Sequence, residues 1–533
     1  MMTVATPERP GKKRPLLPRN WTREERSRPR HSADLIRIGL VKSGEAFVCG
    51  LTLVIALAVV MAPLASAEKV SIHVGPNVDI AGEALPDREI VEPGIAVDPR
   101  NPDIVAAAAE DANTVPAGGC FSSARCHMWP VYFRSTDGGK KWSSRLLPGF
   151  PGDTSPQGLA SPLQNFSHVG HVSVAFDRSG NVYYSGFVAN FDSSGFIRSS
   201  TRIVVIKFAN DGADYVGATV LPTSTAGIGG SVAFPRMAVD TSGGPNDGTV
   251  YLTFVDFAND GYTSFFTRSM DGGVTFSKAI LIPGGVLSVA PVVDPTGNVF
   301  VESVHCTGGL VCSPGTLAVI QVAKSVDAGL TFGKPVTAAT VTPDPTPFPG
   351  NAFVSEFLTG ISWHIAADDH GVYIVWDDFA TGNANVLFSE STDGGVSWST
   401  PIVVNDVTRG QQFLPDVAVS GGIISVVWYD SRLGQLANGT ITSLDVFYAE
   451  STDGGSTFST SVRVTSISFD PNLVERGDIA GPAFIPFIGD RIGLAASPTV
   501  VHAIWTDNRN GCDTIDPTFG CVDQDVFVAE ITP

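Results

Sequence analysis

The sequence is poor in basic residues and lacks the motifs of several common enzyme classes. It holds 34 Lys and Arg against 53 Asp and Glu, a formal net charge of −19. Because such a charge repels phosphate backbones and anionic lipid, we expect no nucleic-acid partner. No Gly-rich phosphate loop stands at a strand-to-helix junction, and neither HExxH nor GxSxG occurs. These absences argue against nucleotide, zincin and α/β-hydrolase chemistry.

Long stretches of helical periodicity are also missing, so no separate helical domain is expected. Instead, 56 Gly and 37 Pro are spread along the 533 residues. This distribution is typical of many short strands joined by turns.

The N-terminus reads as an export segment. A basic, Pro-interrupted stretch is followed by an apolar run and the triplet Ala65, Ser66, Ala67. This pattern predicts a secretory signal at 1–67, a mature protein at 68–533 and no membrane association after cleavage. The alternative is an uncleaved membrane anchor over 46–65. The mature part would carry a net charge of −25, since residues 1–67 hold eleven basic and five acidic residues.

Cysteine is scarce and paired. Of seven cysteines, one lies in the export segment, and the other six form three close pairs: Cys120 with Cys126, Cys306 with Cys312, and Cys512 with Cys521. In an exported chain, this arrangement predicts three local disulfides. The spacing does not suit a zinc site.

One short motif recurs through the chain. Five copies read Ser-x-Asp-x-Gly-x-x-aromatic, as in "STDGGVSW" at 391–398, and their aspartates are Asp137, Asp271, Asp327, Asp393 and Asp453. The last four aspartates are separated by 56, 66 and 60 residues, and the first gap of 134 contains a decayed copy, "FANDGADY". A repeat of about sixty residues predicts an array of similar modules.

Each module contains four predicted strands with turn residues between them, which is the pattern of a propeller blade. First strands near Gly94, Val172, Arg236, Pro291, His364, Asp416 and Arg491 give seven blades. The last module is one strand short, while "KVSIHV" at 69–74 is unassigned. We therefore predict an all-β propeller whose ring is closed by this N-terminal strand; six blades with one irregular module is the alternative.

The motif resembles the Asp-box, or BNR repeat, of sialidase-like β-propellers, and the resemblance covers most of residues 90–533. The residues themselves indicate a structural role. Asp393 can accept hydrogen bonds from turn N–H groups, Ser391 can add another, and Gly394 or Gly395 can supply positive φ. Trp398 can then pack between neighbouring sheets.

Alternating strand direction places the boxes on one face of the ring and the long loops, with all predicted disulfides, on the other face. We call this second face the top face. Polar residues at the ends of second strands should reach it, and so should arginines that begin first strands. The candidates are Asp430, Asp507 and Glu302 as catalytic carboxyl groups and Arg236, Arg432, Arg509, Arg491, Asp377 and Asp256 as substrate-binding residues.

Two of these arginines belong to a repeated Asp-x-Arg pattern, in "WYDSR" and "WTDNR". One interpretation is structural, with ion pairs from Arg432 to Asp445 and from Arg509 to Asp525. The other is that the arginines converge on the centre and grip an acidic sugar.

The resemblance implies a sialidase site with an arginine triad, a tyrosine nucleophile assisted by a glutamate, and an aspartate acid/base. The Phe/Tyr-Arg-Ile-Pro element that supplies the first arginine is absent here, since 234–237 reads "FPRM", and no Tyr/Glu pair can be assigned. Two hypotheses remain: a secreted glycan-directed hydrolase, acting as a monomer on glycan or glycoprotein, or a non-catalytic propeller that binds glycan or protein. No cofactor is expected, although Ca²⁺ bridging the top-face aspartates fits either hypothesis.

Overall fold

The computed structural model describes residues 71–81, 90–111, 128–190, 200–222, 232–256, 263–285, 287–306, 316–343, 363–436, 441–471, 476–477, 485–486, 488–510, 515–516, 520–521 and 524–532. The expected export segment lies outside these residues. Each predicted disulfide also has at least one cysteine outside them. The cleavage site and the disulfides therefore stay predictions. Within the described residues, no helix has the length and apolar character needed to cross a membrane.

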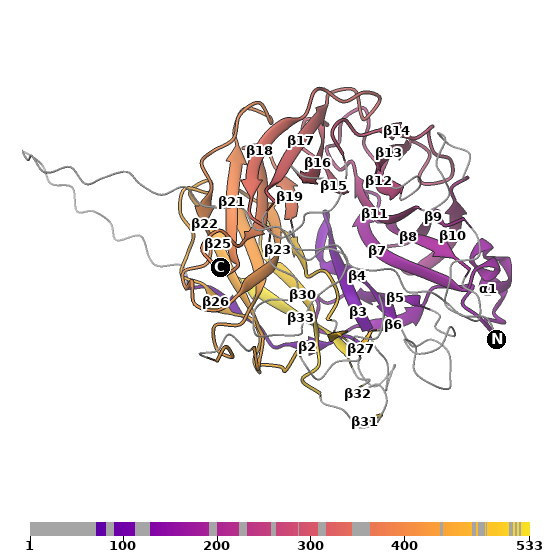
Figure 1. The fold of residues 1–533 in the computed structure, drawn as a ribbon. Coiled ribbons are helices and arrows are strands. Elements are labelled where there is room, and N and C mark those ends of the chain that lie inside the picture. The colour runs from indigo at the N-terminus through magenta and orange to yellow at the C-terminus, as the bar shows by residue number, and fades with distance from the viewer. Residues whose placement is uncertain are drawn as a thin grey trace, which may run out of the picture. The chain divides into compact units, whose positions relative to one another are not determined.

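Strands dominate the described chain and form seven antiparallel blades (Figure 1). The first blade contains β3 (Ile90–Asp98), β4 (Asn101–Asp111), β5 (Trp129–Ser135) and β6 (Ser143–Leu146). The second contains β7 (His168–Phe176), β8 (Val182–Ala189), β9 (Arg202–Ala209) and β10 (Asp214–Val220). The third contains β11 (Val232–Val239), β12 (Val250–Asp256), β13 (Thr263–Ser269) and β14 (Ile280–Leu281). The fourth blade contains β15 (Leu287–Val293), β16 (Val299–Cys306), β17 (Ala318–Ser325) and β18 (Val336–Val341). The fifth contains β19 (Trp363–Ala367), β20 (Val372–Asp378), β21 (Asn385–Ser391) and β22 (Ile402–Val403). The sixth contains β23 (Gln412–Ser420), β24 (Ile423–Asp430), β25 (Asp445–Ser451) and β26 (Val462–Arg463).

The seventh blade is completed by the N-terminal part of the chain. It contains β29 (Gly493–Ala496), β30 (Val501–Asp507) and β33 (Asp525–Thr532), and the outer strand is β1 (His73–Val74) with β2 (Val78–Asp79). His73 pairs with Thr532 and Val78 with Val528. Both the seven-bladed prediction and closure by the N-terminal strand are confirmed.

Short helices and two-residue strands lie in the connections outside the blades. α1 (Pro156–Ala160) and η2 (Pro162–Asn165) lie in the connection between the first two blades, and two short ladders join β27 (Arg476–Gly477) to β28 (Ile485–Pro486) and β31 (Ile515–Asp516) to β32 (Gly520–Cys521).

The first strand of each blade is its innermost strand. Contacts between successive inner strands run β3, β7, β11, β15, β19, β23, β29 and back to β3. The second strands are covered on both faces by neighbouring sheets, which explains why runs such as "VYLTFVD" (250–256) are buried at every residue. Trp129, Trp376, Trp428 and Trp505 are all fully buried in this core.

The five Asp-boxes share one hydrogen-bond pattern in the hairpin between third and fourth strands. The serine hydroxyl donates to the aspartate at 2.7–3.0 Å, and the N–H of the second box glycine donates to the serine at 2.8–2.9 Å. The backbone N–H four residues beyond the aspartate donates to its Oδ1 at 2.9 Å. The Thr275 hydroxyl and N–H accordingly lower the pKa of Asp271 to about 2.

Each box also contacts the blade before it. A Cβ on Gly395, which has φ +86°, would meet Phe300 of the preceding blade at 3.4 Å. The box aromatics continue this contact: Phe332 packs edge-on against Phe266 and Phe458 against Phe388, with centroids 4.9 and 5.1 Å apart. The boxes thus stabilise their own hairpins by hydrogen bonds and also pack against the preceding blade.

The role of the box can be tested at Asp393. Replacing it by Ala removes the acceptor of the Ser391 hydroxyl and of the Val396 and Ser397 N–H groups. We expect D393A to lower Tm by a few degrees in calorimetry. Asp369→Ala, at an exposed aspartate in a hairpin outside the boxes, should leave Tm nearly unchanged. A D393A protein of normal Tm that has lost a ligand would contradict the structural role.

Candidate axial site

Five of the seven inner strands have a β-bulge near their N-terminal ends in the described chain. Register shifts fall at Val91/Gly94, Gly170/Ser173, Ala233/Arg236, Ser288/Pro291 and Phe413/Asp416. Within four of these bulges, Glu92, His171, Phe234 and Leu414 have φ between 49° and 56°. We call these four the bulge residues. A non-glycine residue in this region is strained, and bulges recur beside functional sites because they re-aim side chains.

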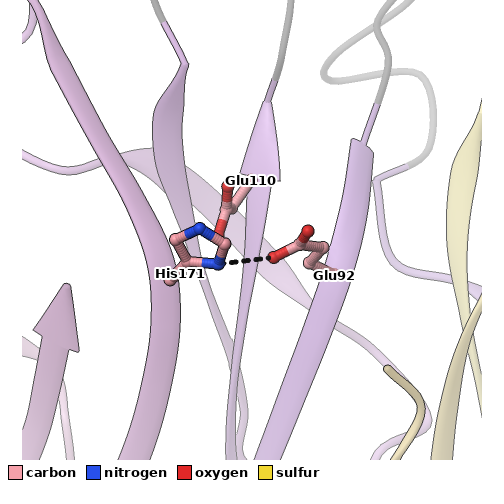
Figure 2. Close-up of side chains that lie close together, drawn as sticks. All are labelled: Glu92, Glu110 and His171. Carbon is pink, nitrogen blue, oxygen red and sulfur yellow. Dashed lines mark ion pairs between the residues drawn. The ribbon is translucent and has the colours of Figure 1, made fainter. Parts of the chain in front are cut away.

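Three bulge residues from successive blades touch one another near the axis. The ring of His171 lies 4.2 Å from that of Phe234. On its other side, His171 Nδ1 is 3.4 Å from Glu92 Oε2. Figure 2 shows this ion pair, with Glu110 of β4 beside both groups. The local backbone therefore brings a histidine and two carboxyl groups together.

Arg491, just before β29, completes the cluster from the last blade. Its Nη2 lies 3.2 Å from Glu92 Oε2, its Nε lies 3.1 Å from Asp490 Oδ1, and its Nη1 donates to the Val172 carbonyl at 2.6 Å. The Val172 N–H in turn donates to Glu110 Oε1 at 3.2 Å. We call Glu92, Glu110, His171, Asp490 and Arg491 the axial cluster.

The two glutamates of the cluster titrate in opposite directions. Burial alone would raise the pKa of Glu92, but the Arg491 guanidinium and His171 outweigh it and lower that pKa to about 2. Burial raises the pKa of Glu110 well above its usual value, and the Glu92 carboxylate raises it further. Glu110 Oε2 has no hydrogen-bond partner among the described residues. The pKa values of the two carboxyl groups are thus shifted in opposite directions.

Two further polar groups lie within electrostatic reach. Burial, followed by the charge of Arg491, lowers the pKa of Arg236 to about 10, and one of its terminal nitrogens has no described hydrogen-bond partner. Tyr184 is fully buried, and burial together with the charge of Glu110 raises its pKa well above the ordinary value.

Solvent reaches the axis beside this cluster. The side chain of His171 is 19% exposed, and the pair His364 and Asp416, joined at 2.9 Å, is 21% and 14% exposed. Glu110 itself is fully buried. A ligand at the axis would therefore meet His171 before Glu110.

The ligand atoms of Glu92, Glu110 and His171 lie within 4.8 Å of one another, a donor set that could hold a divalent cation. Arg491, however, already supplies positive charge at 3.2 Å from Glu92. This favours a carboxyl pair with an arginine counter-ion over a metal. The only other such group in the described chain, Asp368, Asp369 and His370, is largely exposed. Bridging Ca²⁺ stays a prediction.

Arg432 and Asp430 lie away from the cluster and pair with each other. Arg432 Nη2 is 2.7 Å from Asp430 Oδ2, its Nη1 is 2.9 Å from Asp406, and its guanidinium lies 4.0 Å from the Phe447 ring centroid. Asp430 also accepts from Trp428 Nε1 at 3.0 Å.

The second Asp-x-Arg copy repeats this arrangement. Arg509 Nη2 lies 2.5 Å from Asp507 Oδ2, and Asp507 accepts from Trp505 Nε1 at 2.9 Å. Burial raises the pKa of Asp507, although Arg509 opposes the shift. The predicted partner Asp525 instead accepts from Asn510 at 2.8 Å.

The structural interpretation of the Asp-x-Arg pattern therefore holds, but both predicted partners were wrong. Each arginine pairs with the aspartate two residues before it, because the first turn residue folds back over the strand end. Asp445, predicted for Arg432, is taken by Arg463 at 2.5 Å.

The remaining candidates are scattered. Glu302 is fully buried in β16, where burial raises its pKa well above the usual value. Asp377 accepts the N–H of the bulge residue Leu414 at 3.0 Å. Asp256 ends β12 and is 6% exposed.

Of the predicted residues, only Arg236 and Arg491 meet at the axis. The sequence reasoning named none of Glu92, Glu110 and His171 as site residues. A signal existed: the bulge residues Glu92, Phe234 and Leu414 each precede a proline, at Pro93, Pro235 and Pro415, where the first strand begins. Proline in a strand often marks a bulge.

Stability should separate the two kinds of arginine. Arg432→Ala leaves fully buried Asp430 without its counter-ion and should cost about 3–5 kcal/mol of unfolding free energy. Arg236→Ala should cost less, since one of its terminal nitrogens has no described hydrogen-bond partner to lose. Denaturant unfolding of both variants measures the difference. Equal losses would contradict the assignment of Arg432 as structural and Arg236 as available.

Comparison with protein-family models and with curated proteins finds no match. Among solved structures, the chain is similar to a Hadza microbial sialidase (TM-score 0.41, 11% identity, 86% of this chain and 91% of that one). It is also similar to the GH93 α-L-arabinofuranosidase of Fusarium graminearum (0.42, 13%, 74% and 99%) and to the intramolecular trans-sialidase of Ruminococcus gnavus (0.39, 12%, 66% and 92%). Likeness at this level carries no argument about activity. From its own strand order and box hairpins, the chain has a seven-bladed β-propeller fold.

Proposed function

We propose that this protein is a secreted, glycan-directed propeller that hydrolyses glycosidic bonds of acidic glycans at the axial cluster. The observation that carries the proposal is the Glu92 and Glu110 pair, whose pKa values are driven apart by burial, Arg491 and His171. Two carboxyl groups in one site, one charged and one neutral, are the arrangement that acid/base glycoside chemistry uses. Secretion through residues 1–67 belongs to the proposal.

The roles follow from the protonation states. Glu110, held neutral, donates its proton to the glycosidic oxygen as the bond from that oxygen to the anomeric carbon breaks. Glu92, held charged, bonds to the anomeric carbon. Water then attacks that carbon, gives a proton to the Glu110 carboxylate and releases Glu92. Carboxyl atoms of the two groups lie within 4.8 Å of each other, and we therefore propose a retaining mechanism, in which the second carboxylate is the nucleophile.

Arg236 supports an acidic substrate. Its buried nitrogen lacks a described partner, and a planar guanidinium matches a carboxylate bidentately. Arg491 is already engaged by Glu92, Asp490 and the Val172 carbonyl. One available arginine fits a single carboxylate, as in a uronic or sialic acid unit. Arg432 and Arg509 take no part.

The second candidate is a monomeric propeller that binds glycan or glycoprotein without turnover. Two observations favour it: Arg432 and Arg509 are neutralised by their own aspartates, and Glu110 is fully buried. Such a binder would use Arg236 and His171 and would leave the carboxyl pair as buried structure.

Turnover decides between the two candidates. We would incubate the mature protein with fluorogenic sialosides, uronides and arabinofuranosides, beside Glu110→Gln and the box variant Asp393→Ala. Glu110→Gln keeps the shape of the side chain but removes the proton, so kcat should fall by a factor of about 10² or more. D393A, assayed below its Tm, should retain activity. No turnover on any glycoside, with binding intact, would overturn the hydrolase proposal in favour of the binder.

The pH dependence provides an independent readout. Because the folded pKa of Glu110 is raised, activity should fall as pH rises through that value, and the stabilisation from a neutral Glu110, complete at low pH, should be lost over the same range. Glu110→Gln should flatten the loss in a plot of unfolding free energy against pH. A wild-type protein whose stability rises throughout this range would contradict the assignment of Glu110 as the neutral acid.

A further inference from the structure

A cavity lies on the top face, away from the axial cluster. It has a volume of about 470 Å³ and is lined by Pro162, Asn165, Phe166, Asn190, Ser200, Arg202 and Val220. Its wall combines η2 of the connection between the first two blades with the ends of β8, β9 and β10. We call it the blade-two pocket.

Hydrogen bonds fix the polar wall of this pocket. Asn190 Oδ1 accepts the Ser167 N–H at 2.9 Å, and Asn190 Nδ2 donates to the Asn165 carbonyl at 3.1 Å. Asn165 Nδ2 donates to the Pro162 carbonyl at 3.2 Å, which leaves Asn165 Oδ1 without a described partner. The half-buried ring of Phe166 lies beside these amides. An apolar ring next to fixed amide groups suits one face and the hydroxyl groups of a sugar.

Arg202 gives the pocket its charge. The residue is exposed and has no ion pair in the described chain, a state that it shares with several other arginines but not with Arg432 or Arg509. In a protein of net charge −19, an unpaired guanidinium in a pocket favours a carboxylate ligand.

The strand register places the pocket outward from the axis along the second blade. His168 of the inner strand pairs with Ala189, which precedes Asn190, and Val188 pairs with Arg202. Strands lie about 5 Å apart, so the pocket begins roughly 5–10 Å from the inner strand. His171 on that same inner strand belongs to the axial cluster. Several sugar units can bridge this distance.

We propose that the blade-two pocket is an outer subsite for an acidic oligosaccharide whose terminal unit lies at the axis. Phe166 packs against a sugar ring, the two asparagines contact its hydroxyl groups, and Arg202 binds a carboxylate. The substrate class is therefore an extended acidic glycan, which rests on the proposed function.

The test compares long and short ligands by isothermal titration calorimetry. The probes are tetragalacturonate, a neutral glucose tetrasaccharide of equal length, and galacturonic acid. Protein from a host without N-glycosylation is required, because Asn165-Phe166-Ser167 is an acceptor sequence and a glycan there would fill the pocket.

Arg202→Gln should weaken tetragalacturonate binding about tenfold and leave galacturonic acid unchanged, and Phe166→Ala should weaken the long ligand as well. The matched control is Lys278→Gln, which removes one positive charge from an exposed residue that follows a box; it should change neither affinity. Equal losses in Arg202→Gln and Lys278→Gln, or no advantage of tetragalacturonate over galacturonic acid and the neutral chain, would overturn the subsite.

The two proposals fail separately. Turnover of small glycosides with no effect of Arg202→Gln would remove the subsite and leave the hydrolase proposal standing. Arg202-dependent binding of tetragalacturonate, without turnover of any glycoside, would support the subsite and remove the hydrolase.

Discussion

Closure of the ring is the constraint on which the rest of the molecule depends. β33 would present an open edge without β1 and β2, and open edges invite pairing with other chains. Closure also brings the last inner strand against the first, since β29 contacts β3. The axial cluster lies at this seam: Arg491 from the last blade meets Glu92 of the first and the Val172 carbonyl of the second. A site built this way exists only in the closed ring.

The cluster is costly to fold. Glu92 and His171 have strained backbone conformations. In addition, the carboxyl groups of Glu92 and Glu110 and the guanidinium of Arg491 lose their hydration when they are buried. The buried charge is not needed for a propeller, because the inner strands of other blades carry apolar bulge residues such as Leu414, with the same positive φ, at the matching position. Buried charges and shifted pKa values that coincide in one cluster are therefore what the proposed function depends on.

The sequence revealed what the blades have in common and missed what distinguishes them. The boxes, the strand count and the closing strand followed from repetition, because each blade must solve the same hairpin and packing problem. The Asp-x-Arg pattern was visible for the same reason, and it proved to be shared structure. Glu92 and Arg491 are about 400 positions apart in the chain. The local sequence around either residue does not predict their contact. Their meeting depends on the register of bulges and on closure, which only three-dimensional structure provides.

The acidic ligand that we propose would have to bind to a protein that is itself acidic. A net charge of −19 opposes anionic glycans at long range, but salt screens that repulsion beyond about 8–10 Å. At contact distance, the attraction for an anion comes mainly from guanidinium groups without carboxylate partners. The positive charge of a paired arginine such as Arg432 is largely neutralised by its aspartate. Arg236 and Arg202 are both in this state on the top face. Repulsion elsewhere on the surface then disfavours nonspecific anion binding and confines recognition to a ligand that can reach these arginines.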